Sequence, residues 1–386
     1  MKGGKLLAEG GYGCVFLPGI NCDGSIMTTR KYVSKIQKRD RSARNEIEIG
    51  KIIQKITNYN ERFSPIIKYC SIDVASIMDK DKEKCMVLKK KKIKNFITMK
   101  VLYIQGGDLL DYIMKHANST QIIGNLIDGY KYLLESIALL IKKKIVHYDL
   151  KGMNILFSDA KQLPIIIDFG LSIQVNKINK DNMKDFFYVY APDYYVWPLE
   201  VHYLCLLVNK TKSPSKTDLK ELAHEYVKNN KGLTKNYSSN FLKQFEKKCY
   251  NQLLYYNSFS DEKRLSKLVN YWPTFDNYGL SIMYLKFLSY INIDGYNNNP
   301  FVIFLSKLCL QNIDPDPEKR LGIMETLQTF KAFLHNKKIN NIMTFEELVA
   351  GFVDERKNLL EIIVSDSKTD SVLYKNIVKG KKKAAR

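Results

Sequence analysis

Short apolar runs separated by polar turns dominate the first hundred residues. Runs at residues 5–7, 14–17 and 31–36 have the length and composition that predict β-strands. Residues 42–56 instead place isoleucines at positions 49, 52, 53 and 56, which is the spacing of one face of a helix. The pattern predicts a small α+β unit at this end of the chain.

Beyond Gly107 the hydrophobic period becomes that of long amphipathic helices. We expect helices over residues 122–141 and around residues 278–290, with short extended runs near Ile155 and Ile165. The second unit is therefore predicted to be mostly helical.

Three parts of the chain follow from these patterns. Residues 1–103 form the first unit, residues 104–340 the second, and residues 341–386 a helical extension with a basic tail. Residues 209–271 are polar, rich in Lys and Asn, and carry no motif, so we expect an insertion there.

Net charge narrows the choice of partners. The chain of 386 residues has 61 Lys and Arg against 40 Asp and Glu, a formal charge of +21, which favours an anionic partner. Acidic proteins, phosphorylated ligands, nucleic acid and anionic membranes all satisfy this requirement. Lysine runs at residues 89–94 and 379–383 could contact nucleic acid or anionic lipid or be a nuclear signal, and the alternative is solvated surface lysines. Neither run has interleaved aromatic residues that would stack on bases.

Seven cysteines are scattered singly, with no Cys-x-x-Cys pair. We interpret them as reduced thiols of an intracellular protein. No apolar run approaches the ~18 residues needed to span a bilayer, and the N-terminal residues do not read as a secretory signal. The sequence therefore predicts a soluble intracellular protein.

A glycine-rich turn lies between the first two predicted strands. Gly10, Gly11 and Gly13 precede Val15, and such a turn can bring backbone N–H groups against phosphate oxygens. An ordinary hairpin has the same composition, so this motif needs others beside it.

Two later stretches carry much more information. Residues 147–156 read His-Tyr-Asp-Leu-Lys-Gly-Met-Asn-Ile-Leu, and residues 165–170 read Ile-Ile-Ile-Asp-Phe-Gly. This pairing resembles the catalytic loop and metal-binding turn of eukaryotic-type Ser/Thr protein kinases. The resemblance implies a bilobal α+β fold with a small β-rich N-lobe, a larger, mainly helical C-lobe and ATP bound between them. The divergent motifs and the richness in Ile, Asn, Lys and Tyr also resemble kinases encoded by large DNA viruses, which implies host cytoplasm or virions as the location.

The resemblance implies catalytic roles for four residues. Lys35 would hold the α- and β-phosphates of ATP, and Glu46 would orient Lys35 through an ion pair. Asp149 would accept the proton of the substrate hydroxyl, and Lys151 would approach the γ-phosphate. Glu48 is an alternative to Glu46, because two residues along a helix differ by about 200 degrees and only one can face the lysine.

The same resemblance implies the cofactor and metal ligands. Asn154 and Asp168 would bind Mg²⁺ or Mn²⁺ through oxygen. Ala8 stands where the family has its first loop glycine, and Asp108 would reach the ribose hydroxyls. The full set of implied ATP-binding residues is Ala8, Glu9, Gly10, Gly11, Tyr12, Gly13, Val15, Lys35, Leu102, Ile104 and Asp108.

Later matches come with departures from the family pattern. Pro198, Leu199 and Glu200 resemble the end of the activation segment, although Leu199 replaces a proline, and Arg320 resembles the arginine that pairs with the closing glutamate. Tyr148 replaces the arginine that grips an activation-segment phosphate, and residues 168–200 contain no threonine. We therefore expect activity without activation-segment phosphorylation. Packing of the aromatic side chains between Phe186 and Trp197 would hold the segment instead.

Two hypotheses of different class follow. The first is an ATP-dependent kinase that phosphorylates Ser or Thr of protein substrates, since Lys151 resembles the Ser/Thr-specific branch and the positive charge favours acidic substrates. The alternative is a catalytically silent kinase-like scaffold that binds acidic partners or nucleic acid. Such a scaffold is expected to have lost a catalytic lysine or metal ligand, and all are present here. The sequence does not specify the oligomeric state.

Overall fold

A computed structural model describes residues 5–9, 13–77, 83, 85–89, 95–116, 122–290, 299–335, 364–366, 368–370 and 372. Contacts divide the chain into two compact units. The N-terminal unit comprises Met1–Gly106, Ser158–Lys161 and Ile165–Ser172, and the C-terminal unit comprises Gly107–Phe157, Gln162–Pro164 and Ile173–Arg386. The predicted helix at 345–363 and both lysine-rich runs lie mainly or wholly outside the described residues.

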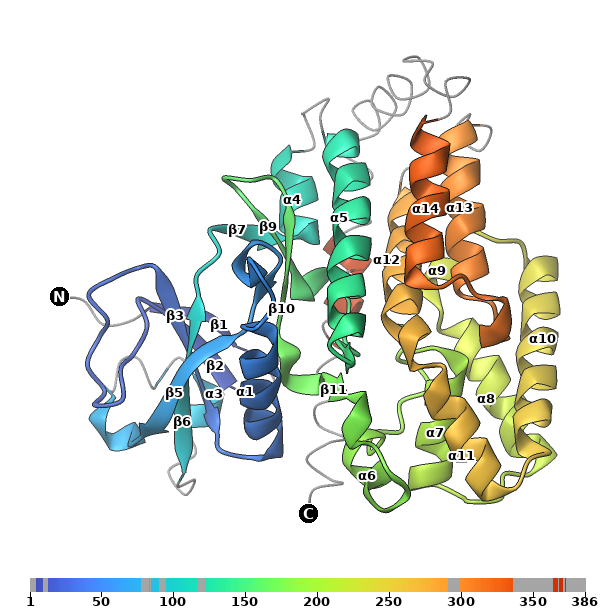
Figure 1. The fold of residues 1–386 in the computed structure, drawn as a ribbon, viewed down its shortest axis with the longest axis horizontal. Coiled ribbons are helices and arrows are strands. Elements are labelled where there is room, and N and C mark those ends of the chain that lie inside the picture. The colour runs from blue at the N-terminus through green and yellow to red at the C-terminus, as the bar shows by residue number, and fades with distance from the viewer. Residues whose placement is uncertain are drawn as a thin grey trace. The chain divides into compact units, whose positions relative to one another are not determined.

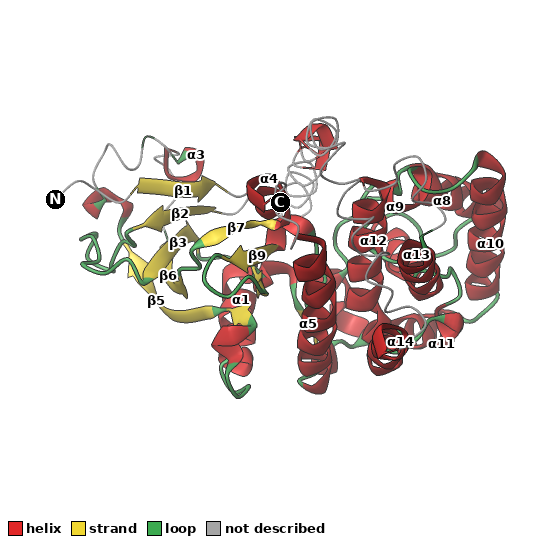
Figure 2. Cartoon of the chain, turned by 90° about the horizontal axis from the view of Figure 1, so that it is seen from above, coloured by secondary structure: helices red, strands yellow, loops and turns green. Residues whose placement is uncertain are grey.

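A five-stranded antiparallel sheet forms the centre of the N-terminal unit, in the order β1-β2-β3-β6-β5 (Figure 2). Its strands are β1 (Lys5–Glu9), β2 (Gly13–Leu17), β3 (Tyr32–Lys38), β5 (Ile66–Ile72) and β6 (Phe96–Leu102). The unit also contains α1 (Arg41–Ile53), α3 (Met86–Lys89), β4 (Phe63–Ser64) and β10 (Pro164–Ile167), and β10 pairs in parallel with β4. The three predicted strands and the helix are confirmed.

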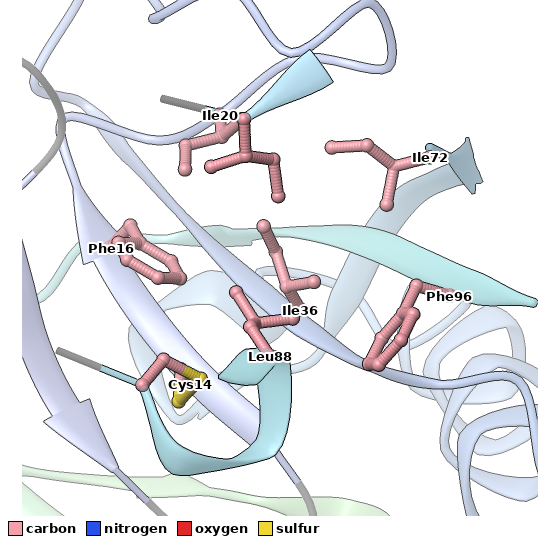
Figure 3. Packing of buried hydrophobic residues seen from close by; sticks show 9 residues of the cluster. Cys14, Phe16, Ile20, Ile36, Ile72, Leu88 and Phe96 are labelled. Carbon is pink, nitrogen blue, oxygen red and sulfur yellow. A yellow bond between two sulfur atoms is a disulfide. The ribbon is translucent and has the colours of Figure 1, made fainter. Parts of the chain in front are cut away.

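One hydrophobic cluster fixes the sheet. Phe16, Ile36 and Phe96, from β2, β3 and β6, are buried together with Leu88 of α3 (Figure 3). Alternate residues of a strand point to opposite faces, so this cluster takes one face. On α1, Asp40 caps the N-terminus by accepting from the Ala43 N–H at 3.0 Å.

Two disulfides in this unit correct the expectation of seven reduced thiols. Cys14 pairs with Cys85 and Cys22 with Cys70, at Cα–Cα separations of 6.1 and 5.8 Å, within the range that a disulfide spans. The other three cysteines are buried and free. The sequence could not reveal the pairs because the partners are 71 and 48 residues apart.

Helices make up most of the C-terminal unit (Figure 1). The described helices are α4 (Leu109–His116), α5 (Ile122–Lys142), α6 (Met183–Phe186), α7 (Leu199–Asn209), α8 (Lys216–Lys228), α9 (Lys231–Thr234), α10 (Ser239–Asn257), α11 (Asp261–Asn270), α12 (Phe275–Tyr290), α13 (Pro300–Asn312) and α14 (Ile323–His335). Short strands are β7 (Gly106–Asp108), β8 (Ile145–Val146), β9 (Ile155–Ser158) and β11 (Ile173–Gln174). The expected α+β class and both predicted long helices are confirmed.

α12 packs against several other helices of this unit, and all of its residues are buried except Met283, Lys286 and Ser289, which are partly exposed. Aromatic rings join it to its neighbours: Tyr130 of α5 contacts Tyr284 of α12 at 4.5 Å and Phe330 of α14 at 4.9 Å between ring centroids. This packing makes α12 a rigid support for the loops at its N-terminal end. Among the described residues, no helix has both the length and the apolar character required to cross a membrane.

Candidate functional site

Three predicted residues meet inside the N-terminal unit. Lys35 of β3 places Nζ 3.0 and 2.9 Å from the two carboxylate oxygens of Glu46 on α1, and 3.0 Å from Oδ1 of Asp168. The Lys35 and Glu46 side chains are largely buried, whereas Asp168 is 31% exposed. Glu48, the alternative partner, lies on the exposed side of α1.

Burial and charge act in opposite directions on this group. Burial lowers the pKa of the Lys35 ammonium, but the carboxylates of Asp168 and Glu46 outweigh burial and raise it above its ordinary value. Burial raises the pKa of Glu46 to about 7, opposed mainly by Lys35. Lys35 therefore carries its positive charge at neutral pH.

The backbone at Asp168 is held in an unusual conformation. Its φ of 59° lies in the left-handed region, which residues other than glycine rarely adopt. The next residue, Phe169, is buried against Phe63 with ring centroids 6.2 Å apart. Ser42 and Asn45 of α1 donate to the Gly170 and Ser172 carbonyls at 3.2 and 2.7 Å, so α1 holds the turn that carries the Asp168 carboxylate.

A second group of predicted residues lies in the C-terminal unit. Asp149 is 2% exposed, and its carboxylate accepts from Lys151 Nζ at 3.1 Å and from Asn154 Nδ2 at 3.0 Å. Asn154 Nδ2 also donates to the Asp149 carbonyl at 2.8 Å. This pair of hydrogen bonds orients the Asn154 amide, whose oxygen is the atom that can bind a hard cation.

Asp276 anchors the loop that carries Asp149. Its carboxylate accepts the backbone N–H groups of His147 and Tyr148 at 2.7 and 2.9 Å, and Tyr148 has a φ of 70°. Burial raises the pKa of Asp276, while His147 and the backbone donors oppose that shift. The rigid helix α12 thus stabilises a strained loop conformation.

Tyr194 was not predicted from the sequence to belong to the site. Its hydroxyl donates to Oδ1 of Asp149, and Lys151 Nζ lies 3.3 Å from the same hydroxyl. Four tyrosines lie between Asp168 and Glu200, so nothing in the local sequence distinguishes Tyr194.

Aromatic packing surrounds Tyr148, which follows the buried His147. The Tyr148 ring stacks on Trp197 at 4.9 Å between centroids and meets Phe187 edge-on at 6.2 Å. Trp197 Nε1 also donates to the Tyr148 carbonyl at 2.7 Å. Residues 187–197 are therefore tied directly to the loop that carries Asp149.

Glu200 and Arg320 form a buried ion pair in the same unit. The two N–O distances are 2.6 and 3.0 Å, and both side chains are 0% exposed. Burial acts to lower the pKa of Arg320, but Glu200 outweighs burial and raises it. The pair fixes the start of α7 against the segment that precedes α14.

The remaining predicted nucleotide ligands have varied environments. Asp108 is partly buried, accepts the Asp111 N–H at 3.0 Å, and has a pKa raised by burial. Ile104 is 9% exposed, while Leu102 and Val15 are partly buried and Ala8 and Glu9 are exposed. Gly13 begins β2, and Gly10, Gly11 and Tyr12 lie outside the described residues.

Comparison with known proteins places these residues in a family context. The family described as "Protein kinase domain" matches residues 1–330. A probable receptor-like protein kinase of Arabidopsis thaliana is 28% identical over 180 residues, covering 44% of this chain and 24% of that protein. Serine/threonine-protein kinase 1 of a Heliothis zea nuclear polyhedrosis virus is 35% identical over 85 residues, covering 22% of this chain and 31% of that protein.

The solved autoinhibited serine kinase domain of titin is also similar. It has 13% identity and a TM-score of 0.43, with 90% of this chain and 85% of that chain covered. The chain thus spans under a third of the length of the two curated relatives named above.

Proposed function

Because the chain belongs to the protein kinase family, we propose that it transfers the γ-phosphate of ATP to serine or threonine hydroxyls of protein substrates. The observation that carries the proposal is the bonding of Asp149 to Lys151 and Asn154. A buried carboxylate fixed by these donors is suited to accept a proton from an attacking hydroxyl.

Residues of the N-terminal unit would bind the nucleotide. Lys35, held by Glu46, would pair with the α- and β-phosphates, and the glycine turn would offer backbone N–H groups to the phosphates. Leu102 and Ile104 would contact the base, and Asp108 of the C-terminal unit would contact the ribose.

A divalent cation fits the donor chemistry of two residues. Asp168 is partly exposed and Asn154 is oriented by Asp149, and both offer the hard oxygens that Mg²⁺ and Mn²⁺ prefer. Such a cation neutralises phosphate charge when bound.

The transfer step uses Asp149 and Lys151. The substrate hydroxyl oxygen attacks the γ-phosphorus, the bond to the β–γ bridging oxygen breaks, and ADP leaves. Asp149 takes the hydroxyl proton, while the Lys151 ammonium stabilises charge on the transferred group.

The activation segment supports activity without prior phosphorylation. Tyr148 occupies the place of the phosphate-binding arginine, and its stacking on Trp197 provides packing in place of an ion pair. Phosphatase treatment is therefore expected to leave the activity unchanged. Loss of activity, with phosphosites mapped to residues 168–200, would contradict this part of the proposal.

The test of the catalytic proposal is phosphate transfer from labelled ATP with Mg²⁺ to one acidic and one basic protein. We expect transfer by the intact chain and loss in Asp149→Asn and in Lys35→Met. Lys38→Met is the matched control, because Lys38 lies on the same strand and is exposed. If the intact chain binds ATP with Mg²⁺ but transfers nothing to either protein, the proposal fails and the silent scaffold becomes the better account.

A further inference from the structure

Three lysines in the C-terminal unit gather at two C-terminal aspartates. Lys231 at the start of α9, Lys235 just after it, and Lys286 of α12 form this lysine cluster. Lys231 Nζ lies 3.0 Å from Asp370 and 4.0 Å from Asp366, while Lys235 pairs with Asp366 and Lys286 with Asp370.

Burial makes these contacts unlike ordinary surface ion pairs. The three lysine side chains are 13% to 29% exposed and the two aspartates 14% and 24%. Burial lowers the pKa of the Lys286 ammonium, and Asp370 opposes that shift. Partly desolvated ammonium groups need acidic partners, and three lysines against two aspartates leave positive charge in excess.

One lysine of the cluster, Lys286, lines a pocket together with residues of the loop that carries Asp149. The residues that line this pocket of about 110 Å³ include Lys286, Phe287 and Asp370 together with Leu150, Lys151 and Tyr194. An occupant bound at Lys286 therefore lies at the same pocket as Lys151, which donates to the Asp149 carboxylate.

The two aspartates that contact the lysine cluster indicate what kind of ligand the cluster binds. Asp366 and Asp370 are four residues apart, the spacing that places two side chains on one face of a helical turn. Tyr290 adds a hydroxyl that donates to Asp366 at 2.9 Å. Carboxylates at this spacing accept hydrogen bonds from all three lysines and balance two of their three positive charges.

We propose that Lys231, Lys235 and Lys286 form a docking surface for acidic segments of the protein substrate, which Asp366 and Asp370 occupy in competition with it. This inference deepens the proposed function and rests on it for the identity of the bound protein as a substrate. Acidic partners were one of several classes consistent with the charge of the chain, and the lysine cluster gives them a location whose Lys286 lines the same pocket as Lys151.

Binding can be measured without catalysis. The probes are two fluorescent peptides with one serine each, one carrying aspartates four residues apart and one with asparagines instead. Fluorescence anisotropy in the absence of ATP reports the affinity of each. We expect Asp366→Asn/Asp370→Asn to bind the acidic peptide about tenfold more tightly than the intact chain, since the two aspartates no longer compete for the lysines.

Removing the charges of the three lysines tests the other half of the proposed contact. Adding Lys231→Gln, Lys235→Gln and Lys286→Gln to that variant is expected to abolish the gain. Lys243→Gln/Lys247→Gln/Lys248→Gln is the matched control, because it removes the same charge from exposed positions of α10. The acidic-peptide affinity should fall with added salt.

Several results would overturn the proposal. They are an equal gain for the asparagine peptide, an equal loss in the α10 control, or tighter binding of a single-stranded oligonucleotide than of the acidic peptide. Because none of these readouts needs phosphate transfer, an inactive enzyme that still binds the acidic peptide contradicts only the proposed function. In an active enzyme, the ratio of kcat/KM for the acidic and neutral peptides should rise in the aspartate variant.

Discussion

Removing the charge of Glu200 tests the buried ion pair that organises the C-terminal unit. Glu200→Gln keeps the size of the side chain but leaves the Arg320 guanidinium with a neutral partner. The remaining acceptors of Arg320 are the Asp314 carbonyl at 2.8 Å and the Thr274 hydroxyl at 3.2 Å, which do not compensate a full positive charge.

The size of the effect follows from the burial of the pair. Both side chains are 0% exposed, and removing one partner of such a pair destabilises a protein by roughly 3–5 kcal/mol because an uncompensated charge stays buried. The second substitution Arg320→Met, added to Glu200→Gln, removes that charge. We expect it to restore a large part of the lost stability.

Tryptophan fluorescence during urea unfolding is a suitable assay. The chain has two tryptophans, Trp197 and Trp272, and both belong to the unit that contains the ion pair. Glu262→Gln is the control, since Glu262 pairs with Lys180 at exposed positions, 75% and 62% exposed, and its loss should leave the midpoint unchanged. A Glu200→Gln midpoint equal to that of the control would refute the reasoning.

Three further predictions concern stability in acid, reduction of a disulfide and the carboxylate of Asp149. Burial lowers the pKa of His202 to about 4, below its unfolded value of about 6.5, so the unfolded state binds more protons between these values. The free energy of unfolding should fall by on the order of 3 kcal/mol as the pH drops from 6.5 to 4. Urea unfolding of His202→Gln, followed over the same pH range, should not show this loss. Reducing the Cys14–Cys85 disulfide, which closes a separation of 71 residues, should cost about 4 kcal/mol and lower the calorimetric Tm; identical scans with and without reductant would contradict that. Tyr194→Phe removes the hydroxyl bonded to Asp149 and should lower kcat about tenfold with the KM for ATP unchanged, whereas an unaltered kcat would show that the hydroxyl does not position the carboxylate.

Local pattern was sufficient for the main elements of the fold. Strands β1, β2 and β3 and helix α5 were predictable because each has its own period of apolar residues and its own bounding turn residues. Both features can be read from one short stretch of sequence. The residues proposed to carry the chemistry could be picked out for a different reason, since two short contiguous stretches contain Asp149, Asn154 and Asp168.

Contacts between distant segments could not be predicted in the same way. Helical geometry alone left Glu46 and Glu48 open, because the face that packs on the sheet depends on the tertiary structure. The disulfides and the approach of Asp370 to Lys231 join residues far apart in sequence, and no spacing rule encodes them. Tyr194 was missed because its role depends on the path of the whole segment before α7.

The most direct test of the proposed activity is identification of the phosphorylated residue by mass spectrometry. The intact chain, Lys35→Met and the Lys38→Met control would each be incubated with ATP, Mg²⁺ and a peptide carrying serine, threonine and tyrosine. We predict phosphate on serine or threonine with the intact chain and the control, and none with Lys35→Met. Phosphate that appears equally with Lys35→Met, or on tyrosine alone, would contradict the account.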